Sequence, residues 1–313
     1  MIQDAASNTQ HTVIAVATTI NPAIHTQLEQ LVRAALLDAA GRELNMRDLC
    51  PSREDFALCA DLPLSGQAAS DLRATLSNAL QGQVDVAVVP TAATRKRLLI
   101  CDMDSTVIGQ ECLDELADFA GRKSEVSAIT ERAMAGELEF DGALTERVAM
   151  LAGLELSALQ ACFEERISLN AGARTLVATM KAHGARAVLV SGGFTFFTGR
   201  VAEAAGFEAH RGNTLIDDGA ALTGKVGQPI LGREAKLTAL EDEITALKLA
   251  ASDVLAMGDG ANDLAMIEAA GLGVAYRAKP VVAAASDAAI DISDLTAALY
   301  FQGYERREFE MRF

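Results

Sequence analysis

The chain lacks the residues and runs that mark several classes of protein. None of its 313 residues is tryptophan and aromatic residues make up only 4%, so a core must be packed mainly by Ala, Leu and Val. No apolar run approaches the ~20 residues that a membrane-spanning helix needs. Residues 1–10 hold no basic segment followed by an apolar stretch, so a secretory signal is not expected. The sequence therefore predicts neither a membrane protein nor a secreted one.

Cysteine is scarce, and its spacing is irregular. The five cysteines form no C-x-x-C pair, and an odd number cannot all be joined in intrachain disulfides. We expect reduced, mostly buried thiols and hence a reducing compartment, the cytoplasm. The four histidines show no metal-ligand spacing and are interpreted as structural.

Basic residues are also much fewer than acidic ones. Lys and Arg number 27 against 43 Asp and Glu, which gives a formal net charge of −16. Such a balance argues against nucleic acid or an anionic membrane as a partner. An anionic substrate would have to be captured by local groups, because distant charges are screened over about 8 Å at physiological salt.

What the chain does have is a pair of carboxylates at the end of a short apolar run, 98–101. Asp102 and Asp104 follow this run, which is typical of a strand buried on both faces. If the strand continues, both side chains point the same way; a bend would let one residue offer its carboxylate and the other its backbone carbonyl to a cation. Oxygen ligands of this kind favour Mg²⁺ over zinc. The alternative is an Asp-Ser-Thr cluster that caps a helix starting near Thr106.

Three later segments help to decide between a cation site and a helix cap at Asp102 and Asp104. A second apolar strand, 186–194, ends in Ser191 and two glycines, and a third, beginning at Asp253, runs into a turn with Asp259 and Asp263. Between them, Gly232 to Lys236 opens a helical stretch. Each segment alone has an ordinary interpretation as a turn, a solvent-facing lysine or a helix cap. Ligands in open parallel sheets gather at the carboxyl ends of strands, where these residues are predicted to lie.

Strand and helix signals divide the chain into two parts. Residues 1–92 are predicted to form a ferredoxin-like α+β domain with the order β-α-β-β-α-β. Residues 93–313 are predicted to form an α/β domain with a parallel Rossmann-like sheet, in which a helical insertion at about 109–181 forms a cap over the strand ends. Asp218 and Gly219 predict a hairpin turn.

The four segments, in this order, resemble the four motifs of the haloacid-dehalogenase-like phosphatases, and among them look most like the phosphoserine phosphatases. The resemblance covers roughly residues 96–304 and implies a Mg²⁺-dependent hydrolysis through an aspartyl-phosphate. It implies Asp102 as nucleophile and Asp104 as general acid and base. The other implied roles are phosphoryl or substrate contacts from Ser191, Gly192, Lys236 and Asn262, metal contacts from Asp102, Asp104 and Asp259, and a supporting position for Asp263.

The predicted cap carries residues that match positions of the same family at its spacing. Glu111 and Arg147 would contact the ammonium and the carboxylate of phosphoserine, and Met134 and Phe140 would close over the substrate. Taken singly, each has another interpretation: Arg147 could pair with an acid on a helix surface, and Phe140 could belong to the core.

Other functions compete with a phosphoserine phosphatase. The aspartyl-phosphate could be passed to another alcohol, or another small phosphomonoester could be the substrate. A receiver or sensor without turnover is a third hypothesis, which Asp104 opposes because it would discharge the phosphoaspartate. The N-terminal part looks like the amino-acid-binding ACT type, which implies serine binding; a structural or dimerising role, and hence a homodimer, is the alternative.

Overall fold

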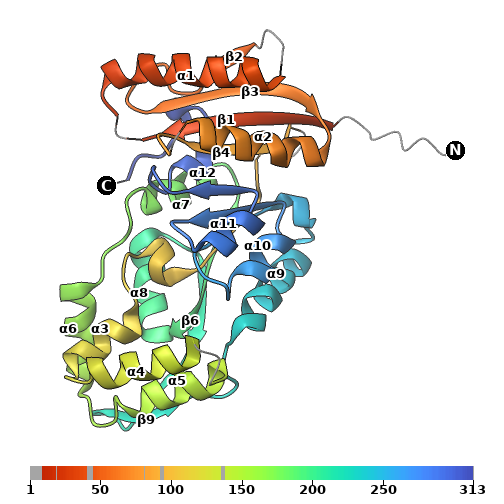
Figure 1. Cartoon of the computed structure of the whole chain (residues 1–313). Helices are drawn as coiled ribbons and strands as arrows, with labels where there is room; N and C mark the ends of the chain where they lie inside the picture. The colour runs from red at the N-terminus through yellow and green to blue at the C-terminus, as the bar shows by residue number, and fades with distance from the viewer. Residues whose placement is uncertain are drawn as a thin grey trace, which may run out of the picture.

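The computed structural model describes six stretches of the chain, residues 9–18, 20–40, 45–80, 82–91, 95–134 and 138–312. Figure 1 shows the N-terminal strands and helices at one end, an α/β region in the middle, and a group of helices at the opposite end. In the described residues no helix is both long enough and apolar enough to cross a bilayer.

Four antiparallel strands and two helices near the N-terminus form the predicted β-α-β-β-α-β unit. Their sheet has the order β2-β3-β1-β4, which is the ferredoxin-like arrangement that the sequence predicts. In α1, Leu28, Val32 and Leu36 recur every four residues and are buried. The elements are β1 (Thr9–Ala17), α1 (Pro22–Ala40), β2 (Met46–Asp48), β3 (Phe56–Leu64), α2 (Gly66–Ala79) and β4 (Asp85–Pro90).

This N-terminal sheet is buried on both faces. Alternate residues of a strand point to opposite faces, and in β1 Val13 and Ala15 pack beneath α1 and α2. Ile14 and Val16 belong instead to the large core that also contains Tyr300. The unit is therefore packed against the rest of the chain by an apolar face.

The middle of the molecule is a parallel sheet in the order β12-β11-β10-β5-β6-β7, as the α/β prediction requires. Its strands are β5 (Leu98–Cys101), β6 (Arg186–Phe194), β7 (Ala209–Asn213), β10 (Val254–Gly258), β11 (Leu272–Tyr276) and β12 (Ala288–Ile290). Its helices are α7 (Ala173–Ala182), α8 (Thr195–Ala205), α9 (Arg233–Leu247), α10 (Leu264–Ala269), α11 (Pro280–Ala285) and α12 (Ala297–Tyr300).

The two sheets join into a single ten-stranded sheet, which the sequence does not predict. Strands β4 and β12 pair antiparallel through Ala87 and Ala288. The buried carboxylate of Asp85 accepts hydrogen bonds from the backbone N–H groups of residues 291, 292 and 293. The predicted boundary at residues 92–93 falls among residues 92–94, outside the described ranges, and stays a prediction.

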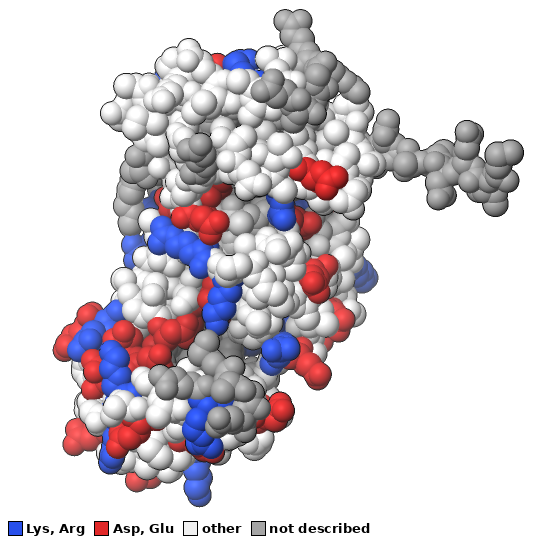
Figure 2. All heavy atoms as spheres, viewed as in Figure 1, with Lys and Arg blue, Asp and Glu red and all other residues white. Residues whose placement is uncertain are grey.

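The helices at the far end lie within the predicted insertion at about 109–181, but α7, which the prediction included in the cap, packs instead against β6 and α8. The helices of the cap are α3 (Cys112–Phe119), α4 (Lys123–Met134), α5 (Phe140–Ala149) and α6 (Leu156–Arg166). The predicted hairpin is also present, with Gly219 at φ +93° between β8 (Leu215–Asp217) and β9 (Leu222–Val226). It lies against α5, where a Cβ at Gly224 would come within 2.8 Å of Ala152. The surface view shows acidic and basic side chains interspersed over this end (Figure 2).

Candidate active site

Asp102 and Asp104 lie where β5 ends in the centre of the parallel sheet. The N–H of Asp102 still bonds to Met257 of β10, at 2.9 Å, so its backbone is held by the sheet. The chain then turns sharply through residues 103–107, and Ser105 takes the left-handed value φ +53°. The chain therefore bends after Asp102, one of the two geometries that the sequence left open.

Ser191, near the end of β6, directly contacts Asp104. Its hydroxyl donates to the Asp104 carboxylate at 3.1 Å and accepts from the N–H of Gly193 at 2.8 Å. A Cβ at Gly193 would lie 2.9 Å from that carboxylate, so only glycine allows this approach. The two strand ends thus hold Asp104 and Ser191 together, as predicted.

Lys236, on the first turn of α9, is almost completely buried between two carboxylates. Its Nζ lies 2.7 Å from Asp102 Oδ1 and 2.5 Å from Asp263 Oδ1. Burial alone would lower the pKa of Lys236, but the two carboxylates overcome it and hold that pKa above its usual range. A lysine with these partners remains charged and contributes a fixed positive charge beneath the cavity.

Asp263 reaches this position through a tight turn after β10. Its side chain is fully buried and accepts from the N–H of Gly260 at 3.0 Å. A Cβ at Gly258 would come within 2.4 Å of the Asp263 side chain, so glycine is required where the strand ends. The turn also presents Asp259 and Asn262 to the cavity.

Three of these carboxylates lie close enough to share a cation. One oxygen each from Asp102, Asp259 and Asp263 lies within 4.8 Å of the others. Burial and the Asp263 charge raise the pKa of Asp259 to about 6, and the same two causes raise the pKa of Asp102. Carboxylates that repel one another in a buried site are the donor set that a divalent cation stabilises, so these residues fit Mg²⁺.

The cap supplies the opposite wall of a cavity of about 610 Å³. Glu111 accepts a 2.6 Å hydrogen bond from the Ser105 hydroxyl, and burial and Asp104 raise the pKa of Glu111 to about 7. Burial lowers the pKa of Arg147, against the opposing charges of Asp114 and Glu111. An acid and a base thus stand at the same cavity.

Phe140 begins α5 and lies at the mouth of this cavity. A Cβ at Gly192 would come within 3.2 Å of its ring, and one at Gly232 within 3.4 Å. The ring thus lies between the end of β6 and the start of α9. The side chain of Met134, the other predicted apolar residue of the cap, lies outside the described residues.

The predicted residues fall into two groups. Lining the cavity are Asp102, Asp104, Glu111, Phe140, Arg147, Ser191, Gly192, Asp259 and Asn262. Lys236 and Asp263 are buried beneath it. Sequence reasoning missed Asp114, Thr130, Arg233 and Lys279, which also line the cavity. Asp114 could have been found, because it follows Glu111 by three residues on a helix and so shares its face; the others carry no comparable signal.

Residues 99–268 match the family described as haloacid dehalogenase-like hydrolase. This match covers more than half of the chain. The chain belongs to the haloacid dehalogenase-like hydrolases. The curated relatives within this family include a phosphoserine phosphatase of Polaromonas, which is 45% identical over 64% of this chain and 86% of its own length.

A second hydrolase, a phosphoserine phosphatase of Streptomyces coelicolor, is 42% identical over 254 residues. The alignment takes in 80% of this chain but 62% of that relative, so the chain spans less than two thirds of its length. This hydrolase family therefore includes longer proteins than the chain described here.

Solved structures of hydrolases extend the likeness to nearly the whole chain. A haloacid dehalogenase-family hydrolase from Salmonella enterica superposes with a TM-score of 0.80 at 31% identity, over 93% of this chain and 98% of its own. A probable phosphoserine phosphatase from Vibrio cholerae superposes with a TM-score of 0.73 at 28% identity, over 98% and 90%. The N-terminal unit is thus shared with hydrolases of known structure.

Proposed function

We propose that this hydrolase converts O-phospho-L-serine to L-serine and phosphate, the last step of a serine biosynthesis. The observation that carries the proposal is the composition of one cavity. Its floor holds Asp102 and Asp104, with the buried Lys236 beneath them, and its cap wall holds Glu111 and Arg147. Several relatives named phosphoserine phosphatase support the same substrate.

In the proposed reaction the Asp102 carboxylate attacks phosphorus and the bond to the serine oxygen breaks. Asp104 gives its proton to that oxygen, and serine leaves. Asp104 then takes a proton from water, whose oxygen attacks phosphorus, and phosphate leaves as the Asp102 carboxylate is restored. Burial raises the pKa of Asp104, which favours a protonated form able to act first as acid.

The other floor residues would stabilise charge on the phosphoryl group. Ser191 and the N–H of Gly192 would hydrogen-bond its oxygens, Asn262 would contact it, and Lys236 would oppose its negative charge. Asp263 would hold Lys236 in position. Ser191 and Lys236 are already held by hydrogen bonds and ion pairs within the protein, which favours charges set in advance of the reaction.

Mg²⁺ is the proposed cofactor. The carboxylates of Asp102 and Asp259 and the backbone carbonyl of Asp104 would hold it. When bound, it would supply charge neutralisation that lets an anionic carboxylate approach an anionic phosphate. The raised pKa values of Asp102 and Asp259 support a cation at this position.

Selection of phosphoserine is assigned to the cap. The Glu111 carboxylate would bind the substrate ammonium, and the Arg147 guanidinium would bind the substrate carboxylate in a bidentate pair. Phe140 would exclude water once the cap closes. A pocket with one acid and one base suits an amino acid that carries its phosphate on the side chain.

The test is release of phosphate from a panel of phosphomonoesters with and without Mg²⁺. We expect L-phosphoserine to give the highest kcat/KM, with p-nitrophenyl phosphate as a generic comparison. A chain that prefers another ester, or that forms a phosphorylated acceptor instead of phosphate, would contradict the proposal.

Compartment and assembly are separate proposals. All five cysteines are unpaired and buried, which supports a reducing compartment such as the cytoplasm. Serine binding by the N-terminal unit and homodimer formation remain predictions from the resemblance of that unit to amino-acid-binding domains.

A further inference from the structure

Acidic side chains outnumber basic ones among the described residues that line the catalytic cavity. Among the residues that the structure describes, five carboxylates and three cations line it. The whole chain also carries a formal charge of −16. The carboxylates are those of Asp102, Asp104, Glu111, Asp114 and Asp259, and the cations are Arg147, Arg233 and Lys279.

Two other cations near the cavity have contacts within the protein. Lys236 contacts both Asp102 and Asp263. Arg147 lies within the fields of Asp114 and Glu111, and its Nε donates to the carbonyl of Ala143. Lys236 is buried beneath the cavity, and Arg147 is only partly exposed in its cap wall.

Arg233 and Lys279 differ from those two. Both are exposed, and in the described stretches of the chain neither forms an ion pair with an acid. Arg233 is the first residue of α9, and Lys279 directly precedes α11, so two separate helices bring them to the cavity.

Arg233 also lines a second space beside the catalytic cavity. A second hollow of about 770 Å³ adjoins the catalytic cavity and shares Thr130, Phe140, Arg147 and Arg233 with it. Two guanidiniums therefore line both spaces, and of these Arg233 is the exposed one.

We propose that Arg233 and Lys279 are the capture residues of this hydrolase, which attract the phosphate dianion of the substrate into the catalytic cavity. An exposed cation acts over a distance set by salt, about 8 Å at physiological ionic strength. Local cations at a cavity mouth raise the rate of entry even where the net charge of the protein is repulsive. They act on the phosphate, whatever alcohol it is esterified to.

The inference rests on the proposed phosphatase reaction, but not on phosphoserine as its substrate. The test therefore uses two substrates, L-phosphoserine and p-nitrophenyl phosphate, each measured from low to high ionic strength. The variants are Arg233→Gln, Lys279→Gln and the double variant of the full chain.

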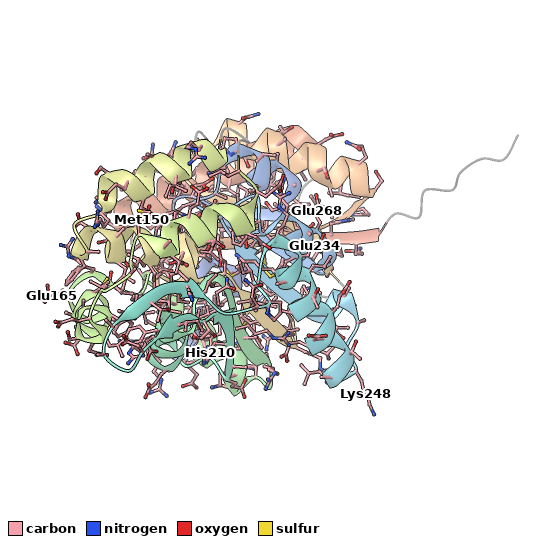
Figure 3. All side chains as sticks on the ribbon, turned by 90° about the horizontal axis from the view of Figure 1, so that it is seen from below. Met150, Glu165, His210, Glu234, Lys248 and Glu268 are labelled. Atoms are coloured by element: carbon pink, nitrogen blue, oxygen red, sulfur yellow. The ribbon has the colours of Figure 1, made fainter. Side chains whose placement is uncertain are left out.

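The matched control is Lys248→Gln. Lys248 follows the last residue of α9, whereas Arg233 is its first residue. Figure 3 labels Lys248 and Glu234, the second residue of α9, at opposite ends of this helix. Lys248→Gln removes one positive charge, as each single variant does, and it lies beside the same helix as Arg233, so its comparison with Arg233→Gln separates a local effect from a change in total charge.

We expect kcat/KM of the double variant to fall about tenfold at low salt on both substrates, with kcat changed less than about twofold. Its dependence on ionic strength should be flatter than that of the wild type, and Lys248→Gln should match the wild type.

Several outcomes would overturn the inference. They are an unchanged salt dependence in the double variant, a loss confined to kcat, an equal loss in Lys248→Gln, or a loss seen with phosphoserine alone, which would make these cations carboxylate ligands. If the wild type hydrolyses only p-nitrophenyl phosphate, the proposed substrate is wrong. The salt dependence of kcat/KM on p-nitrophenyl phosphate would then still test whether Arg233 and Lys279 capture the phosphate.

Discussion

The floor of the catalytic cavity and the wall supplied by the cap differ in how their side chains are held. On the floor, Asp102, Ser191 and Lys236 are each at most 4% exposed, and each is bonded to another buried group. On the cap, Phe140 is 36% exposed and Arg147 bonds to its own helix. The floor side chains are therefore held in place by contacts within the protein. The acid and the base of the cap wall are instead proposed to find their partners in the substrate.

This difference separates chemistry from selection. Parallel strands fix the backbone of the floor residues, and charges set in advance cost no reorganisation when phosphorus reacts. Helices of the cap present side chains that can move with the cap. Substitutions on the floor should therefore affect every ester equally, and substitutions on the cap should depend on which ester is used.

The largest effect is expected from Asp102→Asn. An amide is a very poor nucleophile toward phosphorus, so kcat should fall by about 10⁴-fold or more on both phosphoserine and p-nitrophenyl phosphate. Steady-state phosphate release measures the loss, and circular dichroism checks the fold. Asp118→Asn, in an outer ion pair of the cap, is the control and should keep its activity. Turnover within tenfold of the wild type would show that Asp102 is not the nucleophile.

Lys236→Met tests how much the buried lysine of the floor contributes to the free energy of unfolding. It leaves the buried carboxylates of Asp102 and Asp263 without their cation, and breaking a buried pair in this way costs about 3–5 kcal/mol. Urea unfolding would measure the change, with the exposed Lys225→Met as control.

The pH dependence of that loss has a defined sign. Burial and Asp263 raise the pKa of Asp102, and Lys236 opposes them. Without the lysine, the folded-state pKa of Asp102 rises further above its unfolded value, so its contribution to stability is present at low pH and is lost as pH rises through the folded pKa. Lys236→Met should therefore be less destabilised at pH 5 than at pH 8, and the reverse order would contradict the buried-charge argument.

Much of the floor could be predicted from the sequence because local rules specify it. Short apolar runs predict β5 and β10, and the topology of a parallel sheet brings the ends of such strands together, so Asp102 and Asp259 were expected to meet. The contact of Lys236 with Asp263 is different. A lysine on a helix is usually exposed, and only the order of the motifs indicated a role for it.

The joined sheet could not be predicted, because it depends on contacts between distant segments. Asp85 and the backbone of residues 291–293 are more than 200 positions apart, and no local pattern relates them. Arg233 and Lys279 escaped notice for a similar reason: an isolated cation has no spacing, and only the folded chain places it at a cavity.

On the cap, Arg147→Ala should act on one substrate far more than on the other. Loss of a charged hydrogen-bond partner costs about 2–3 kcal/mol, so kcat/KM on phosphoserine should fall by roughly 100-fold. On p-nitrophenyl phosphate, which has no carboxylate, the fall should be within about threefold. Arg132→Ala is the matched control, because Arg132 lies on the cap in an exposed pair with Glu146. Equal losses on both esters would contradict the claim that the cap, unlike the floor, selects the substrate.

The smallest effect concerns the charge of Glu111. Burial and Asp104 raise its pKa to about 7, so in the free protein the carboxyl gains a proton as pH falls below that value. The ammonium of phosphoserine then loses its counter-charge, and KM should rise about tenfold from pH 8 to pH 6. Ionisation of the phosphate itself affects both esters, so the informative quantity is the ratio of KM for phosphoserine to KM for p-nitrophenyl phosphate. That ratio should follow a single titration in the wild type and be flat in Glu111→Gln. A ratio independent of pH in the wild type would mean that the ammonium binds elsewhere, and the cap wall would then select its substrate through Arg147 alone.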